Sequence, residues 1–206
     1  MLADVFQKIW SLLTRSNKKK KLTVTPAQDI LDIWKQLCKE YHVPDLQLVF
    51  TYTNELQGKV ATQLATPDSY VIALTSGSVI LSKLTKKTSV KINCVYLLCD
   101  HVYPHLLLAR DKYESRLNEL TLMLRHEIGH AISLKEKYEN LTELQLTKLD
   151  AYIEKHDKSI VIPSVANTYT KVYNYLMQAE EEWANKAAGV DARELALALT
   201  SFYEVK

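Results

Sequence analysis

The feature that most limits the fold of this chain is a long helical pattern in its middle, from Arg110 to about Glu139. Large apolar residues recur there three or four positions apart, which is the spacing of one face of an α-helix. The chain also has only four glycines and five prolines. We therefore expect long helices and few tight turns. The residues on the expected apolar face are Leu117, Leu120, Leu124 and Ile128.

A helix and several short strands are expected before this long helix. Thr25 and Pro26 form an N-cap followed by proline at the first helical position, which predicts a helix that ends near Tyr41. The strands follow without an intervening helix, so they favour a small, twisted, mostly antiparallel sheet over a parallel α/β sheet. The expected strands are Leu46 to Thr53, Lys59 to Ala65, Tyr70 to Leu74 and Ile92 to Cys99.

The second half of the chain is expected to be helical. A helix is predicted from Leu141 to His156, and another from Thr168 to Ala188 with Gly189 as its stop. Asp191 is in position to cap a last short helix that ends near Leu199. Together with the sheet, these elements predict an α+β domain that covers residues 22–206.

Residues 1–21 form a separate segment in this interpretation. Apolar residues between Leu2 and Leu13 follow helical spacing, and the basic run Lys18 to Lys21 comes directly after them. One interpretation is an amphipathic helix that docks on a membrane surface or a partner through residues 2–13. The alternative is a helix packed on its own domain and followed by a solvated linker.

Composition narrows the classes of function. The net charge of +2 is too small to favour nucleic acid as a partner. Three cysteines without a C-x-x-C pair argue against a disulfide framework or a zinc ribbon. No stretch approaches the roughly 20 apolar residues of a membrane span, and the N-terminus reverses the charge order of a signal peptide. These observations favour a cytoplasmic protein.

The segment that carries chemistry is His126-Glu127-Ile128-Gly129-His130. A helix places residues four apart on one face, so His126 and His130 can bind one zinc ion together. Glu127 can then act as the general base on a water molecule at the same site. The neighbouring positions are mostly apolar, which allows this helix to be buried around the site.

A catalytic zinc needs a third protein ligand. The metzincin extension is excluded because Ser133 and Glu136 occupy its glycine and histidine positions. A glutamate from a later helix is the other common source, and the helix around Glu180 and Glu181 supplies candidates. On a helical wheel Glu180 lies nearer the apolar face than Glu181, so spacing alone leaves both open.

The two segments together resemble the gluzincin metallopeptidases. Their third ligand often belongs to a pattern Glu-x-x-Ala-Asn/Asp-x-x-Ala, which Glu181, Ala184, Asn185 and Ala188 match here. The order of elements is similar to that of small ImmA/IrrE-type and M48-type proteins. The resemblance implies a minimal zincin fold, one zinc held by His126, His130 and Glu181, and peptide-bond hydrolysis with Glu127 as base. It also implies a protein or peptide substrate, and Asn185 as a partner of a ligand histidine.

Other features remain open at this stage. In gluzincins a strand edge beside the zinc pairs with extended substrate, and the expected hairpin from Lys59 to Leu74 is the candidate here. A Tyr or His often stabilises the oxyanion, and nothing in the sequence selects among Tyr169, Tyr173 and His156. His101 and His105 flank Pro104 in an expected loop and could form a second metal site. The alternatives to a peptidase are a zinc protein without turnover and a structural protein without metal.

Overall fold

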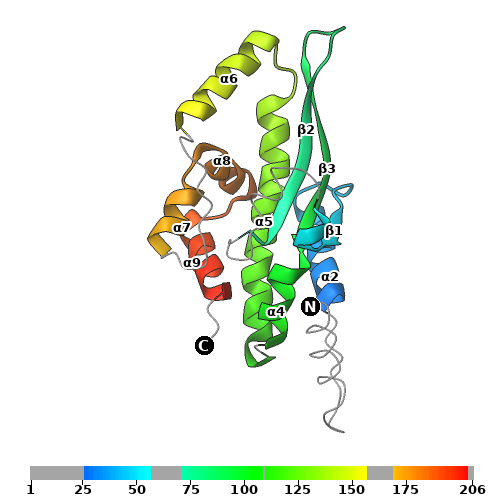
Figure 1. Cartoon of the computed structure of the whole chain (residues 1–206). Coiled ribbons are helices and arrows are strands. Elements are labelled where there is room, and N and C mark those ends of the chain that lie inside the picture. The colour runs from blue at the N-terminus through cyan, green and yellow to red at the C-terminus, as the bar shows by residue number, and fades with distance from the viewer. Residues whose placement is uncertain (1–25, 57–70, 109, 157–168, 204–206) are drawn as a thin grey trace.

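The computed structural model describes residues 26–56, 71–108, 110–156 and 169–203. The amphipathic segment within residues 1–21 and the strand expected at Lys59 to Ala65 lie outside these residues. The described part is α+β, with seven α-helices and a three-stranded sheet (Figure 1). The elements are α2 (Pro26–Glu40), β1 (Leu48–Thr51), β2 (Ala73–Leu81), β3 (Thr88–Leu98), α4 (Cys99–Leu108), α5 (Tyr113–Tyr138), α6 (Glu143–His156), α7 (Tyr169–Leu176), α8 (Ala179–Ala188) and α9 (Ala192–Tyr203), with single 3₁₀ turns at Thr53–Glu55 and Arg110–Lys112.

The sheet is mixed, and its longer strand pair is antiparallel as expected, whereas its shorter strand pair is parallel. Its order is β1-β3-β2, and β3 runs parallel to β1 and antiparallel to β2. β2 lies between β1 and β3 in the chain, so β1 and β3 are not joined by a tight turn. Only a tight turn would force two strands to run antiparallel, so β1 and β3 can pair in parallel. β2 and β3 form the hairpin of the described sheet, and most of the segment from Lys59 to Leu74 lies outside the described residues. The sequence signal was weak because β2 exposes much of its surface.

Helix α5 is the centre of the molecule, as its length predicted. The β2–β3 hairpin lies along one side of it and α7, α8 and α9 lie on the other (Figure 1). Its expected apolar face is buried, and Leu120, Leu124 and Ile128 have no exposed surface. Burying large side chains of this kind stabilises the fold by about 1.5–3 kcal/mol each. The core therefore fixes the rotation of α5, and with it the direction of every other side chain on that helix.

The helix predicted from Thr168 to Ala188 is interrupted. α7 ends at Leu176, Gln178 is extended with ψ 156°, and α8 starts at Ala179. The side-chain amide Nδ2 of Asn185 donates a hydrogen bond of 3.1 Å to the Leu176 carbonyl. This bond satisfies a carbonyl group at the end of α7 and so stabilises the break. Periodicity could not reveal this, because the stabilising bond comes from nine residues further along the chain. The C-terminal stop at Gly189, with φ 62°, is as predicted.

Gly129 sets the distance between α5 and α8. A Cβ atom at this position would lie 2.0 Å from the Ala184 carbonyl oxygen and 3.0 Å from the Ala188 Cβ. No side chain fits such a space, so the two backbones touch at this point. The small residues that meet here come from the two motifs that the sequence analysis singled out. This contact is what brings the second half of the candidate site onto the first.

Gly129→Ala is expected to destabilise the protein although alanine is the better helix former. Forced contacts in a packed interior cost about 1–3 kcal/mol and sometimes more, against a propensity gain of about 1 kcal/mol. Urea unfolding would measure the difference. Gly189→Ala is the matched control, since a Cβ there meets nothing within 4 Å and only the positive φ opposes it. A Gly129→Ala protein more stable than the Gly189→Ala protein would contradict this account.

His101 and His105 lie on helix α4, not in the loop expected around Pro104. His101 is buried, and the His105 ring packs against Phe202 and Tyr203 of α9 with centroid distances of 5.4 and 4.7 Å. The Nδ1 atoms of both imidazoles have no hydrogen-bond partner in the described part of the chain. Burial lowers the pKa of His101, and burial with the nearby charges of Arg116 and His101 lowers that of His105.

These lowered pKa values predict an acid-sensitive fold. Below the ordinary imidazole pKa of 6.5, the unfolded chain takes up protons that the folded chain resists, so the free energy of unfolding falls as pH falls. Above 6.5 both states are neutral and this contribution is constant. His105→Phe, which keeps the aromatic packing, should make the decline shallower. Urea unfolding between about pH 5 and pH 8 tests this, and equal slopes for both proteins would contradict it.

Candidate metal centre

One turn of α5 brings three potential ligands together. His126 is buried, while Glu127 and His130 are partly buried in the wall of a cleft. One ligand atom from each lies within 4.8 Å of the others, which is close enough for one metal ion. Among the described residues, this is the only group of three or more such side chains. The pair His101 and His105 is not part of any such group.

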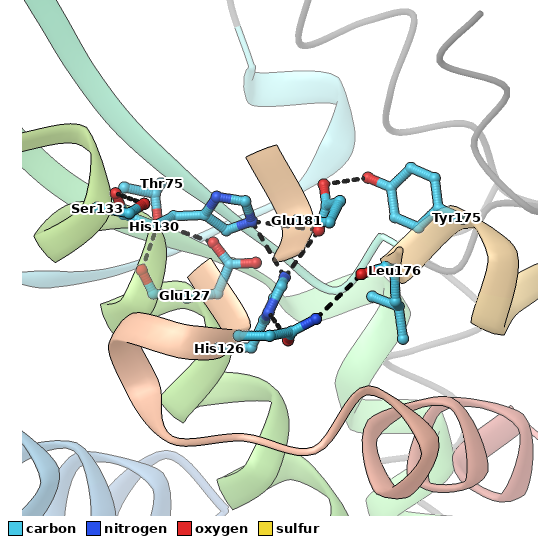
Figure 2. A network of polar contacts seen from close by, with 9 residues as sticks. Thr75, His126, Glu127, His130, Ser133, Tyr175, Leu176 and Glu181 are labelled. Carbon is cyan, nitrogen blue, oxygen red and sulfur yellow. Dashed lines mark hydrogen bonds and ion pairs between the residues drawn. The ribbon is translucent and has the colours of Figure 1, made fainter. Parts of the chain in front are cut away.

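Glu181 reaches this group from α8. Its Oε2 lies 2.9 Å from Nε2 of His126 and 3.3 Å from Nε2 of His130 (Figure 2). The neighbouring Glu180 points differently, and its Oε1 accepts a hydrogen bond from the Tyr138 hydroxyl at 3.4 Å. The structure therefore places Glu181, and not Glu180, against both imidazoles. The wheel argument for Glu180 assumed one straight helix from Thr168, which the break before α8 removes.

The spacing of these atoms fits a small tetrahedral cation. Nε2 of His126 and Nε2 of His130 are 3.0 Å apart, which completes a triangle with the Glu181 oxygen. Bonds of about 2.0–2.2 Å in a tetrahedral zinc site put neighbouring ligand atoms roughly 3.3–3.5 Å apart. The triangle is thus within a few tenths of an ångström of that requirement. Two nitrogens and one carboxylate oxygen are also a donor set that zinc accepts.

Asn185 fixes the tautomer of His126. Its Oδ1 lies 2.8 Å from Nδ1 of His126, and its Nδ2 donates to the Leu176 carbonyl. The second bond decides which end of the amide faces the ring, so Nδ1 of His126 carries the proton and donates it. Nε2 is then the ring nitrogen that faces Glu181 and His130 and is available to a metal ion. An outer hydrogen bond of this kind is the usual way in which a ligand imidazole is oriented.

His130 and Glu181 shift each other's protonation, as their pKa values indicate. Burial lowers the pKa of His130, but the carboxylates of Glu181, Glu127 and Glu180 together raise it more, and the result is a pKa of about 9. Burial raises the pKa of Glu181, whereas His130 and His126 lower it, and the net pKa is well below the ordinary value. The site thus favours an ionised carboxylate beside positive charge. A divalent cation would satisfy the same demand.

Tyr175 belongs to the site although the sequence did not indicate it. Its hydroxyl donates to Oε1 of Glu181 at 2.7 Å, and burial together with that carboxylate raises its pKa well above 10. On one continuous helix, six residues of separation would turn the two side chains well apart. The break before α8 brings them together. The tyrosines considered earlier, Tyr169 and Tyr173, stack on each other instead.

A cleft of about 330 Å³ opens beside these residues. Ala73, Leu74 and Thr75 of β2 form one wall, and Glu127 with His130 forms part of another. The remaining wall is mainly apolar and includes Met123, Leu134, Val172, Leu176, Trp183, Leu195 and Leu199. His156, at the exposed end of α6, packs against Tyr152 and is not part of this cleft.

Comparisons with known proteins add no relative: no family model, no curated protein and no solved structure matches the chain. Across the residues that the structure describes, no helix has the length and apolar character needed to cross a membrane.

Loss of a hydrogen-bond partner of a metal ligand typically weakens metal binding about 10- to 100-fold. Glu181→Gln should weaken zinc binding more than this, because it removes the carboxylate charge beside the two imidazoles. Glu182→Gln is the matched control, since Glu182 pairs with exposed Lys186 on the same helix. Titration calorimetry and zinc content after dialysis would measure both. Glu180→Gln tests the other candidate, and a larger loss for Glu180→Gln than for Glu181→Gln would refute the assignment.

Proposed function

We propose that this protein is a zinc-dependent metallopeptidase that hydrolyses peptide bonds in a protein or peptide substrate. The observation that carries the proposal is the position of the Glu127 carboxyl group, beside two imidazoles that share one carboxylate, in the wall of an open cleft. A structural ion pair needs no second carboxylate there, whereas hydrolysis needs a base next to the metal ligands. His126, His130 and Glu181 would hold the zinc.

When bound, zinc supplies Lewis-acid chemistry that activates water and polarises a carbonyl group. The chain's own residues supply the remaining functions. Glu127 takes a proton from the attacking water on a carboxylate oxygen and later delivers it to the leaving amine. Asn185 keeps the proton of His126 on Nδ1, and Tyr175 holds the Glu181 carboxylate from the side away from the imidazoles. Both hydrogen bonds keep the ligand atoms aimed at one point.

The substrate would lie in the cleft along β2. Among the described strands, β2 has a neighbour on one side only, and its residues Ala73 to Thr75 line the cleft. An extended peptide could add to this edge by backbone hydrogen bonds. Ala73 and Leu74 also belong to the segment first expected as the substrate edge, whose residues 59–70 lie outside the described part of the chain.

Glu127→Gln should abolish cleavage and keep zinc. The loss of a general base typically lowers the rate about 10²- to 10⁴-fold, and glutamine cannot accept the proton. Zinc-loaded protein would be incubated with unfolded casein and a mixed peptide library, and products would be measured by mass spectrometry. Glu136→Gln, on the exposed side of the same helix, is the matched control.

Two results would contradict the proposal. The first is cleavage by the wild type that Glu127→Gln leaves unchanged, since a contaminating protease would then be responsible. The second is stoichiometric zinc without cleavage of any peptide in the library, which would favour the alternative of a zinc-binding interaction protein with the same site.

A further inference from the structure

The Thr75 hydroxyl on β2 has two acceptors on the same glutamate, which share its one hydrogen. Its Oγ1 lies 2.8 Å from Oε2 of Glu127 and 2.9 Å from the Glu127 backbone carbonyl oxygen (Figure 2). Within the described residues, Thr75 is the hydrogen-bond partner of the Glu127 carboxyl group. The bond crosses from the sheet to the helix, between residues 52 positions apart. No pattern in the sequence marks this threonine, which lies just beyond the segment first considered as the substrate edge.

The support behind Thr75 is rigid. The side chain of threonine is branched at Cβ and has few rotamers, and Thr75 pairs with Val95 of the central strand β3. The register of β2 against β3 shifts directly after it, between Ser76 and Gly77. Irregularities of this kind turn side chains and are frequent beside functional sites. A Cβ on Gly77 would lie 2.7 Å from Leu134 Cδ2, so the strand is pressed against α5 at this point.

A glutamate needs such a constraint because its carboxyl group ends a flexible chain. Three rotatable bonds separate the Glu127 carboxyl group from the backbone, and the ion-paired groups of the site lie beside it. The Thr75 hydroxyl holds Oε2, and the second oxygen of Glu127 then points to the side on which His126 and His130 lie (Figure 2). Fixing the reacting group in this way lowers the entropy cost of reaching the transition state.

We propose that Thr75 is a positioning residue for Glu127, which assigns one carboxylate oxygen to structure and leaves the other for proton transfer. This inference rests on the proposed function, because it concerns the base of that reaction. It differs from a stabilising role in a measurable way. Zinc and substrate binding do not pass through the Thr75 hydroxyl, so its removal should affect turnover and leave affinity largely unchanged.

Kinetics of the zinc-loaded protein test the proposal. Thr75→Val, which keeps the shape and removes the hydroxyl, should lower kcat about 10- to 100-fold and change KM less than about threefold, as expected for a lost bond to a charged group. Thr75→Ser should restore kcat to within about threefold. Zinc content should be equal in all proteins. Thr121→Val is the matched control, since its hydroxyl donates to the Leu117 carbonyl and should not affect kcat.

A double-mutant cycle in urea unfolding tests the contact without any turnover. Thr75→Val should shift the unfolding midpoint more in the wild type than in a Glu127→Ala background, because only the wild type has the carboxylate to lose. Equal shifts in the two backgrounds would overturn the contact. Full kcat in Thr75→Val, or loss of kcat that Thr75→Ser does not restore, would overturn the positioning role. If no protein cleaves peptides, the proposed function fails, while the cycle still decides whether Thr75 holds Glu127.

Discussion

The contact on which the rest of the structure depends is the touching of two backbones at Gly129 and Ala184. A side chain at Gly129 would push α8 away from α5, and Glu181 and Asn185 would move with it. Both residues reach the site from α8, Glu181 one turn before that contact and Asn185 directly after it, so a small change in separation would alter each distance around the imidazoles. The glycine in the motif is therefore not a neutral spacer. It sacrifices helix propensity so that a second helix can complete the site.

The ionised Glu181 carboxylate at the centre of the site favours positive charge beside it, and a proton on an imidazole is one source of that charge. A carboxylate, two imidazoles and a tyrosine hydroxyl meet there. The pKa of His130 rises to about 9, so a proton on His130 supplies positive charge between these groups. A metal ion held by the same atoms would first have to displace that proton. The triangle is thus suited to exchange one cation for another. The surrounding bonds from Asn185 and Tyr175 stay in place in either case and hold the ligand atoms.

The sequence predicted those parts of the molecule that depend on local pattern. The apolar face of α5, the helix from Pro26, the stop at Gly189 and the cap at Asp191 all follow from spacing or from the chemistry of one residue. His126, Glu127 and His130 could be placed together because a helix brings residues one turn apart onto the same face. The features that the sequence did not predict depend on residues far apart in the chain. Asn185 ends α7 from nine residues away, and Thr75 meets Glu127 across the sheet–helix boundary. The pairing of β1 with β3 likewise has no local signal.

The distance along the chain between the two halves of the site has a consequence for synthesis. His126 and Glu181 are 55 residues apart, and the hairpin that carries Thr75 precedes both. During translation the long helix and the hairpin can form while α8 is still unmade, because domains begin to fold from the N-terminal side. The nascent chain then presents two histidines and a glutamate without their partner carboxylate. A metal ion would meet the full set of ligands only after Glu181 and Asn185 have been added, so metal loading would wait until much of the last third of the chain has been made.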